Sequence, residues 1–388
     1  MQLLADLLNS EQGLAFLADR GVYTGIGEFS AVMVEPGRAD LGRLLDLKGS
    51  KPVCSGQQVY VDYHASVLAK MVVLQQIEQV KDLAPFFIWH DTDRSGSDPL
   101  ITKFEWPMNQ KSYPLKIAPP ALGEVETRFV SLDPELIQKV LETLKNYLFQ
   151  SKLPDKKLVV ERFEAFKEIF LKYNSASLST FNFELTNFLL ERQFGWKPAS
   201  ALLSFIVENS VLNEGINFAL NNLPSFVQVY NAAIEDLGQR GIDPQVRTLT
   251  EDYLPLYYSC KLDGRRLRLQ HQILKDEHYA VAKCKCNQEY RFYLGQKSLS
   301  LGELAQTGRW SPDVTLPVLL NRQVSGFIMG KSSALYGLVM KEIVAKVFDQ
   351  TPVPFLVPEA LKQAPKVPPE FDSLIYNYLM GKEVQVGS

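Results

Sequence analysis

The chain has few cysteines, no long apolar run and no excess of basic charge. Four cysteines in 388 residues are too few for a disulfide scaffold, so we expect a reducing, cytoplasmic environment. No apolar run approaches the roughly 18 residues of a membrane-spanning helix, and residues 1–10 lack the basic region of a secretory signal, so we expect no membrane partner. A net charge of -3 argues against a nucleic-acid partner, because such proteins usually carry a basic stripe.

The hydrophobic content is high enough for a large buried core. At 46% apolar residues, a chain of this length is expected to fold into two or three lobes. No internal repeat or low-complexity tract interrupts it.

Residues 51–107 have the pattern of a β-α-β unit. A short apolar run ends in Ser-Gly-Gln-Gln at 55–58, a helical stripe follows, and the next apolar run stops at His-Asp-Thr-Asp, residues 90–93. Open α/β sheets bind ligands at the carboxyl ends of their strands, where these polar residues are expected. Gly56 would let a ligand approach the backbone, and the Gln57 and Gln58 amides donate and accept. The alternative is a plain β-α-β unit with a solvated turn.

A second candidate site starts at residue 329, where an apolar run ends in Met-Gly-Lys-Ser-Ser and a helix begins at once. The amides of that helix start, with Lys331, Ser332 and Ser333, can form a cradle for a phosphate or carboxylate. It is not a P-loop, because the spaced glycines are missing. In the alternative interpretation Ser332 caps the helix and Lys331 is a solvated neighbour.

The middle of the chain is predicted to be mainly helical. Residues 114–117 and 125–132 are expected to be strands that extend the sheet, and three helical patterns follow up to about residue 195. A further helix over 216–237 is expected to kink or break at Pro224.

Residues 252–297 change to the alternating pattern of a small antiparallel sheet with two hairpins, the first turning at an Asp-Gly pair, 263–264. A solvated strand face explains its arginines, Arg265, Arg266 and Arg268.

The cysteines of this region are expected to be free thiols. Cys284 and Cys286 would share a strand face, but a structural zinc site needs about four ligands and usually has two residues between its cysteines. His271 and His278 could join them only if the fold happened to bring them close. We therefore expect no zinc here and assign no residue as a direct metal ligand.

Several short motifs, in order, resemble those of the bacillithiol-biosynthesis cysteine-adding enzymes, or putative cysteine ligases. The matching residues are Gly56-Gln57-Gln58, Lys70, the apolar strand 85–89 with Asp91 and Asp93, residues 241–246, Leu256-Tyr257-Tyr258, Asp263-Gly264-Arg265-Arg266, residues 310–314, Pro317, Gln323, Gly330 and Tyr336. The resemblance runs from about residue 52 to 358. It departs from the family at Leu316, Ser333, Lys331, Thr92 and residues 63–66, where the family has other residue types.

The resemblance implies an α/β fold with a Rossmann-like core of mostly parallel sheet, a helical insertion and a small antiparallel hairpin region. Residues 1–132 would be the first part of the core, 133–240 the helical connective insertion, 241–358 the hairpin region and second part of the core, and 359–388 a C-terminal tail helix. It also implies a coiled-coil element, and therefore a homodimer.

The resemblance further implies a ligase-like enzyme that joins an amino acid, with cysteine as the family's substrate, to an amine-bearing small molecule. ATP or ADP and Mg²⁺ are the implied cofactors. A paralogue that uses another amino acid and an inactive scaffold for a partner enzyme are the alternatives.

We assign the candidate site residues by role. The catalytic candidates are His64, Asp91 and Asp93, the cofactor-binding candidates are Gly56, Gln57, Gln58, Gly330, Lys331, Ser332 and Ser333, and the substrate-binding candidates are Lys70, His90, Gln323 and Tyr336. His64 and Lys331 would stabilise phosphate charge from opposite sides. Asp91 and Asp93 would hold Mg²⁺ through waters or take a proton from the incoming amine. The alternative is that the two aspartates only cap the loop 92–96. We expect His64, Asp91, Asp93 and Lys331 to converge on one pocket.

Overall fold

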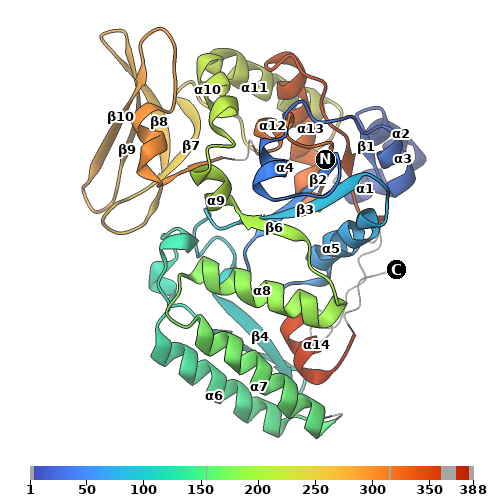
Figure 1. The fold of residues 1–388 in the computed structure, drawn as a ribbon. Coiled ribbons are helices and arrows are strands. Elements are labelled where there is room, and N and C mark those ends of the chain that lie inside the picture. Colours follow the sequence, from blue (N-terminus) through green and yellow to red (C-terminus); the bar gives the residue numbers. More distant parts are fainter. Residues whose placement is uncertain (1–3, 154, 314–315, 360–372, 384–388) are drawn as a thin grey trace.

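A parallel sheet forms the centre of the fold (Figure 1). The structure, a computed structural model, describes residues 4–153, 155–313, 316–359 and 373–383. Within these residues the sheet has six strands, all pairing in parallel. Their order is β1 (Val22–Tyr23), β13 (Phe355–Leu356), β12 (Gly326–Ile328), β2 (Lys51–Gln58), β3 (Leu83–His90) and β6 (Ala199–Leu202). The predicted α/β class is therefore confirmed.

Two crossovers leave the middle of this sheet in opposite directions. From β2 the chain passes through α5 (Ala65–Glu78) to β3, and from β12 it passes through α13 (Lys331–Lys346) to β13 on the other side. Since β2 and β12 are neighbours, the strand order reverses between them. The predicted β-α-β unit and the predicted helix after residue 330 are both present.

Alternate residues of the central strands face two separate hydrophobic cores. Cys54 and Phe86 belong to the core shared with α13, and Val53 and Phe87 to the core shared with α5. The α13 face is covered by α1 (Leu4–Leu8), α2 (Glu11–Ala18), α4 (Asp40–Leu44), α9 (Leu203–Glu208), α10 (Asn213–Asn221), α11 (Leu223–Gln239) and α12 (Leu316–Leu319). The α5 face is covered by α3 (Ile26–Ala31), α6 (Pro134–Gln150), α7 (Lys156–Lys172), α8 (Leu178–Phe194) and α14 (Leu374–Met380).

The segment 133–240, expected to be one helical insertion, divides between these two faces. Helices α6 to α8 pack on the α5 side, the chain then adds β6 to the parallel sheet, and α9 to α11 pack on the α13 side. Helix α6 begins as predicted, with Asp133 accepting from the Glu135 amide and Pro134 in the first turn. The predicted break at Pro224 is also confirmed, because α10 ends at Asn221 and α11 starts at Leu223.

Of two strand predictions near the α6 start, the first is right about the strand but wrong about its sheet, and the second is wrong. Residues 114–116 lie in β5 (Lys111–Lys116), but β5 pairs with β4 (Lys103–Met108) in a separate hairpin rather than with the parallel sheet. Residues 125–132 form isolated bridges and a short 3-10 turn, Thr127–Phe129.

The antiparallel sheet lies beside the α9 end of the parallel sheet, at the left of Figure 1. Its order is β10 (Glu289–Gly295), β9 (Glu277–Lys283), β8 (Arg266–Leu274), β7 (Tyr253–Ser259) and β11 (Trp310–Pro312). Both predicted hairpins are confirmed, although the first turn spans residues 260–265. An isolated bridge between Val125 and Arg265 joins this turn to the loop that follows β5.

Candidate functional site

A cavity of about 590 Å³ lies where the two sheets meet. Its floor is the carboxyl edge of the parallel sheet, from Ser55 and Gly56 on β2 to Ile328 on β12. Tyr257 on β7 and Arg266 on β8 form the opposite wall. Ligands of open α/β sheets bind at the carboxyl edge where the strand order reverses, and the volume suits a small metabolite. This cavity is the candidate site.

The β2 side of the cavity depends on close backbone contact. A Cβ atom added to Gly56 would lie 2.9 Å from Nε2 of His90 and 3.1 Å from the Ile88 carbonyl oxygen, so glycine is needed here. Burial lowers the pKa of His90 to about 4, so this ring, which lines the cavity, is neutral at pH 7.

Lys70 supports this wall from behind. Its ammonium group is buried and donates to the Gly56 carbonyl at 2.6 Å and to Oε1 of Gln57 at 2.9 Å. Burial lowers the pKa of Lys70 to about 7. Lys70 is not among the residues that line the cavity, so it orders the turn rather than contacting a ligand there.

The two predicted catalytic aspartates have different surroundings. Asp93 lines the cavity, where it accepts from Arg266 at 2.6 Å and from Gln58 at 2.6 Å. Asp91 is fully buried and accepts from the amide and hydroxyl of Ser204, at 2.9 and 2.5 Å. Burial raises the pKa of Asp91. Asp91 therefore fixes the start of α9, and its predicted place in the ligand site is wrong.

The antiparallel wall contributes three charged groups, Arg266, Arg268 and Asp313. Arg266 lies over the ring of Tyr257, 3.8 Å from its centroid, and its side chain is only 13% exposed. Arg268 pairs with Asp313 at 3.1 Å and donates to the Tyr257 hydroxyl at 2.6 Å. The Asp313 side chain is 7% exposed, whereas that of Arg268 is 47% exposed. Two cation–carboxylate pairs therefore face one cavity.

The start of α13 completes the floor. The Gly330 amide donates to Oγ of Ser333 at 2.7 Å, so Ser333 caps the helix. Ser333 also lines the cavity, as does Tyr336, whose pKa burial raises to about 12. The side chains of Lys331 and Ser332 lie outside the described residues.

Three further candidates act elsewhere. His64 is exposed at the start of α5 and does not line the cavity. Gln323 accepts from the Leu41 amide at 3.2 Å and contacts Asp40, so it fixes α4. Gln57 donates to the Tyr60 hydroxyl at 2.9 Å and is not part of the cavity wall. The predicted convergence of His64 and Asp91 with Asp93 on one pocket is wrong.

Sequence reasoning missed the residues of the antiparallel wall. The solvated-face interpretation is wrong for Arg266, and it overlooked that Arg266 and Arg268 share a strand face turned towards the parallel sheet. The period-2 spacing of these arginines, with Tyr257 on the paired strand, was the available signal.

Asp91 and Asp93 do not form a Mg²⁺ site. Mg²⁺ needs carboxylate oxygens that can approach one ion. Asp91 is buried against Ser204, and Asp93 is paired with Arg266. Side chains with the composition of a metal site occur instead in the turns of the antiparallel sheet.

No family model matches the chain, and no curated protein matches it either. Within the described residues, no helix combines the length and apolar character needed to cross a bilayer.

Proposed function

We propose that the protein is a ligase-like enzyme that joins an amino acid, with cysteine as the first candidate, to an amine-bearing metabolite. The observation that carries this proposal is the pair of cation–carboxylate contacts, Arg268–Asp313 and Arg266–Asp93, in one cavity at the reversal of strand order. An amino acid carries an α-carboxylate and an α-ammonium group, so it can bind the arginine and the aspartate of one pair at the same time.

Arg268 and Asp313 are the groups that would bind the amino acid. Asp313 is nearly inaccessible to solvent, so its charge must stay paired, while Arg268 is exposed enough to shift. An α-ammonium group beside Asp313 and an α-carboxylate on Arg268 would leave no charge unpaired. The Arg268 guanidinium is suited to bidentate carboxylate binding.

The resemblance to the cysteine-adding enzymes supports the same assignment. Under this proposal the parallel sheet is a Rossmann-like core, and Gly56, Pro317 and Tyr336, three of the matching residues, all line the cavity. Leu316 stands where the family has an arginine, and it lines the cavity too. Arg268, which also lines the cavity, supplies a cation that the substitution removes.

Amide formation needs an activated carboxyl group, and ATP would supply that activation when bound. The α13 start with Ser333, together with Ser55 on β2, would hold its phosphates, because hydroxyls and helix-start amides favour anions. Asp93, the carboxylate beside Arg266, would accept the proton that the attacking amine loses as the carbon–nitrogen bond forms. The bond from the carboxyl carbon to the activated oxygen breaks in the same step, and that oxygen leaves with the phosphate or AMP group it carries. No step is assigned to Mg²⁺, since its expected ligands do not fit.

The test is amino-acid binding followed by product formation. Calorimetry with a panel of free amino acids, with and without ATP or ADP, should identify one substrate. Arg268→Ala should weaken its binding about 10- to 100-fold, the effect of one lost charge-assisted hydrogen bond. Arg291→Ala, on exposed β10 of the same sheet, is the matched control and should leave binding unchanged.

The resemblance to the cysteine-adding enzymes implies an amino-sugar malate conjugate as the acceptor. Mass spectrometry of reactions with the preferred amino acid, this conjugate and ATP should detect an amide product. A protein that binds no amino acid and forms no product would be a scaffold, and the proposal would then be wrong.

A further inference from the structure

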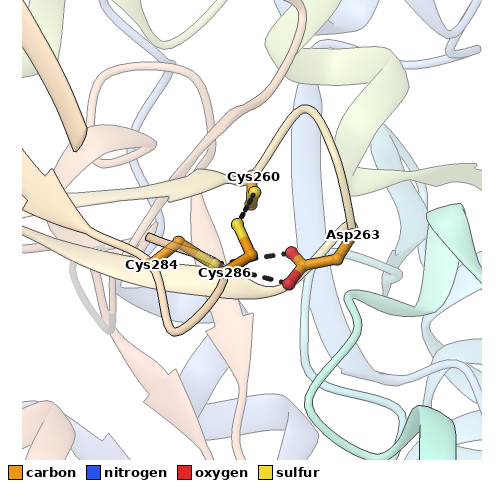
Figure 2. Close-up of side chains that lie close together, drawn as sticks. All are labelled: Cys260, Asp263, Cys284 and Cys286. Carbon is orange, nitrogen blue, oxygen red and sulfur yellow. Dashed lines mark hydrogen bonds between the residues drawn. The ribbon is translucent and has the colours of Figure 1, made fainter. Parts of the chain in front are cut away.

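Four side chains with metal-ligand chemistry meet at one end of the antiparallel sheet, outside the cavity (Figure 2). They are Cys260 and Asp263 from the β7–β8 turn and Cys284 and Cys286 from the β9–β10 turn. One ligand atom from each lies within 4.8 Å of the other three. Cys260 and Cys284 are buried, and Cys286 is partly exposed.

The strand order explains why these distant residues meet. In the order β10-β9-β8-β7 each hairpin reverses the chain, so the first and third turns lie at the same end of the sheet. Gly264 has φ +68° and Asn287 has φ 66°, and these left-handed residues close the two turns tightly. Each turn contributes two ligands, as the knuckles of many structural zinc sites do.

We propose that these four side chains bind one zinc ion, with three thiolates and the Asp263 carboxylate as ligands. Tetrahedral zinc with bonds of about 2.3 Å to sulfur and about 2.1 Å to oxygen places neighbouring sulfurs about 3.8 Å apart and sulfur about 3.6 Å from oxygen. The Cys260 and Cys286 sulfurs are 3.5 Å apart, and the Cys284 sulfur is 3.5 Å from each Asp263 oxygen. These two pairs already have nearly the spacing that the ion requires, and all four ligand atoms lie within 4.8 Å of one another.

Neighbouring groups orient two of the ligands. The Tyr290 hydroxyl accepts from the Lys261 amide at 3.0 Å, so its own hydrogen is available for the Cys260 sulfur, 3.1 Å away. The Asp263 carboxylate accepts from the Arg265 amide at 3.2 Å and contacts the Arg265 guanidinium at 3.3 Å. Such contacts hold ligands in place and offset the negative charge of three thiolates and a carboxylate.

The expectation of free thiols depended on an incomplete ligand set. Cys284 and Cys286 have one residue between them and supply only two ligands, and Cys260 and Asp263 come from a different hairpin. With all four side chains the site is closed, which is typical of structural rather than catalytic zinc.

The ion would fix the turn that leads into the cavity wall. The β7–β8 turn ends at Arg265, directly before Arg266, and its Gly264 carbonyl accepts from the Glu126 amide at 3.0 Å. Zinc would therefore lock the antiparallel sheet where it contacts the parallel-sheet lobe. The site is independent of the proposed ligase activity.

Elemental analysis of the full chain, purified under reducing conditions without added metal, should find about one zinc per chain. Cobalt added to the chelator-treated protein should give the thiolate-to-metal absorption of a tetrahedral sulfur-rich site. Cys286→Ser should lower bound zinc and this absorption at least tenfold. Cys54→Ser, which removes the remaining cysteine, should change neither.

A second variant tests the proposal if Cys286→Ser fails to fold. Asp263→Ala keeps all three thiols and should weaken zinc binding at least tenfold in a competition with a chromophoric chelator. The proposal is overturned if the parent holds no zinc and gives no sulfur-rich cobalt spectrum, or if folded Cys286→Ser or Asp263→Ala binds zinc as tightly as the parent. Zinc retained unchanged by these variants would belong elsewhere, for example to His271 and His278, whose ring nitrogens are 2.8 Å apart.

Discussion

The two walls of the cavity are built in different ways. On the parallel-sheet wall, ionisable groups such as Lys70 and Asp91 are buried behind the surface and hold the backbone in place. On the antiparallel wall, Arg266 and Arg268 present charge to the cavity itself. The first wall thus provides mainly a rigid frame, from which Asp93 alone of these buried and paired acids reaches the cavity, and the second provides the two arginines that face a ligand. A polar residue at the carboxyl end of a strand can belong to either class.

The largest expected effect separates Asp91 from Asp93. Asp91→Ala leaves the Ser204 amide and hydroxyl without their buried acceptor and should lower the free energy of unfolding by about 3 kcal/mol. Asp93→Ala removes the partner of Arg266, but both side chains border the cavity and water can replace the lost contact, so it should cost less, about 1–2 kcal/mol. Denaturant unfolding measures both. Equal losses in the free energy of unfolding would mean that Asp91 and Asp93 do not differ in structural role.

The next effect concerns the close contact at Gly56. Gly56→Ala drives a methyl group against His90 and the Ile88 carbonyl and should destabilise the protein by about 1–2 kcal/mol. Gly238→Ala in α11 is the matched control, because nothing lies within 4 Å of its added Cβ and alanine favours a helix, so it should stabilise by roughly 0.5–1 kcal/mol. Thermal unfolding of the two variants provides the comparison. A Gly56 variant as stable as the parent would mean that this wall is not tightly packed.

The third effect is a pH dependence from Lys70, which develops only above about pH 7. Its pKa is about 7 in the folded protein and about 10.5 when unfolded, so between these values the unfolded chain binds more protons. The Lys70 contribution to stability therefore rises as the pH increases from about 7 towards 10.5, and it has no slope below pH 7. Lys70→Met lacks this contribution, so the parent should gain stability relative to the variant over that range. If the difference in stability between the parent and Lys70→Met stays constant or shrinks over this range, burial does not lower the pKa of Lys70.

Local patterns allowed the frame to be predicted, but not the partners of its side chains. The β-α-β unit, the α6 start at Asp133 and both hairpins follow from periodicity and turn residues close together in the chain. The roles of Asp91 and Asp93 depend on Ser204 and Arg266, which are 113 and 173 residues away. Nothing local distinguishes two aspartates that are two positions apart.

The cysteine cluster shows the same limit. Cys260 and Cys286 are 26 residues apart, and they meet only because the two hairpins pair side by side in one sheet. Each hairpin could be predicted separately, but their shared end depends on the strand order of the whole sheet.

The strand β6 has a consequence for the order of folding. It pairs with β3 across the whole segment of β4, β5 and α6 to α8, and closing a flexible loop of that length would cost about 4 kcal/mol. Packing of α6, α7 and α8 shortens this loop before β6 has to pair. The helical layer is therefore expected to form first, with β6 added at the edge of the sheet afterwards. The bonds between Asp91 and Ser204, just beyond these strands, would then be among the last native contacts to form and the first to break when the chain unfolds.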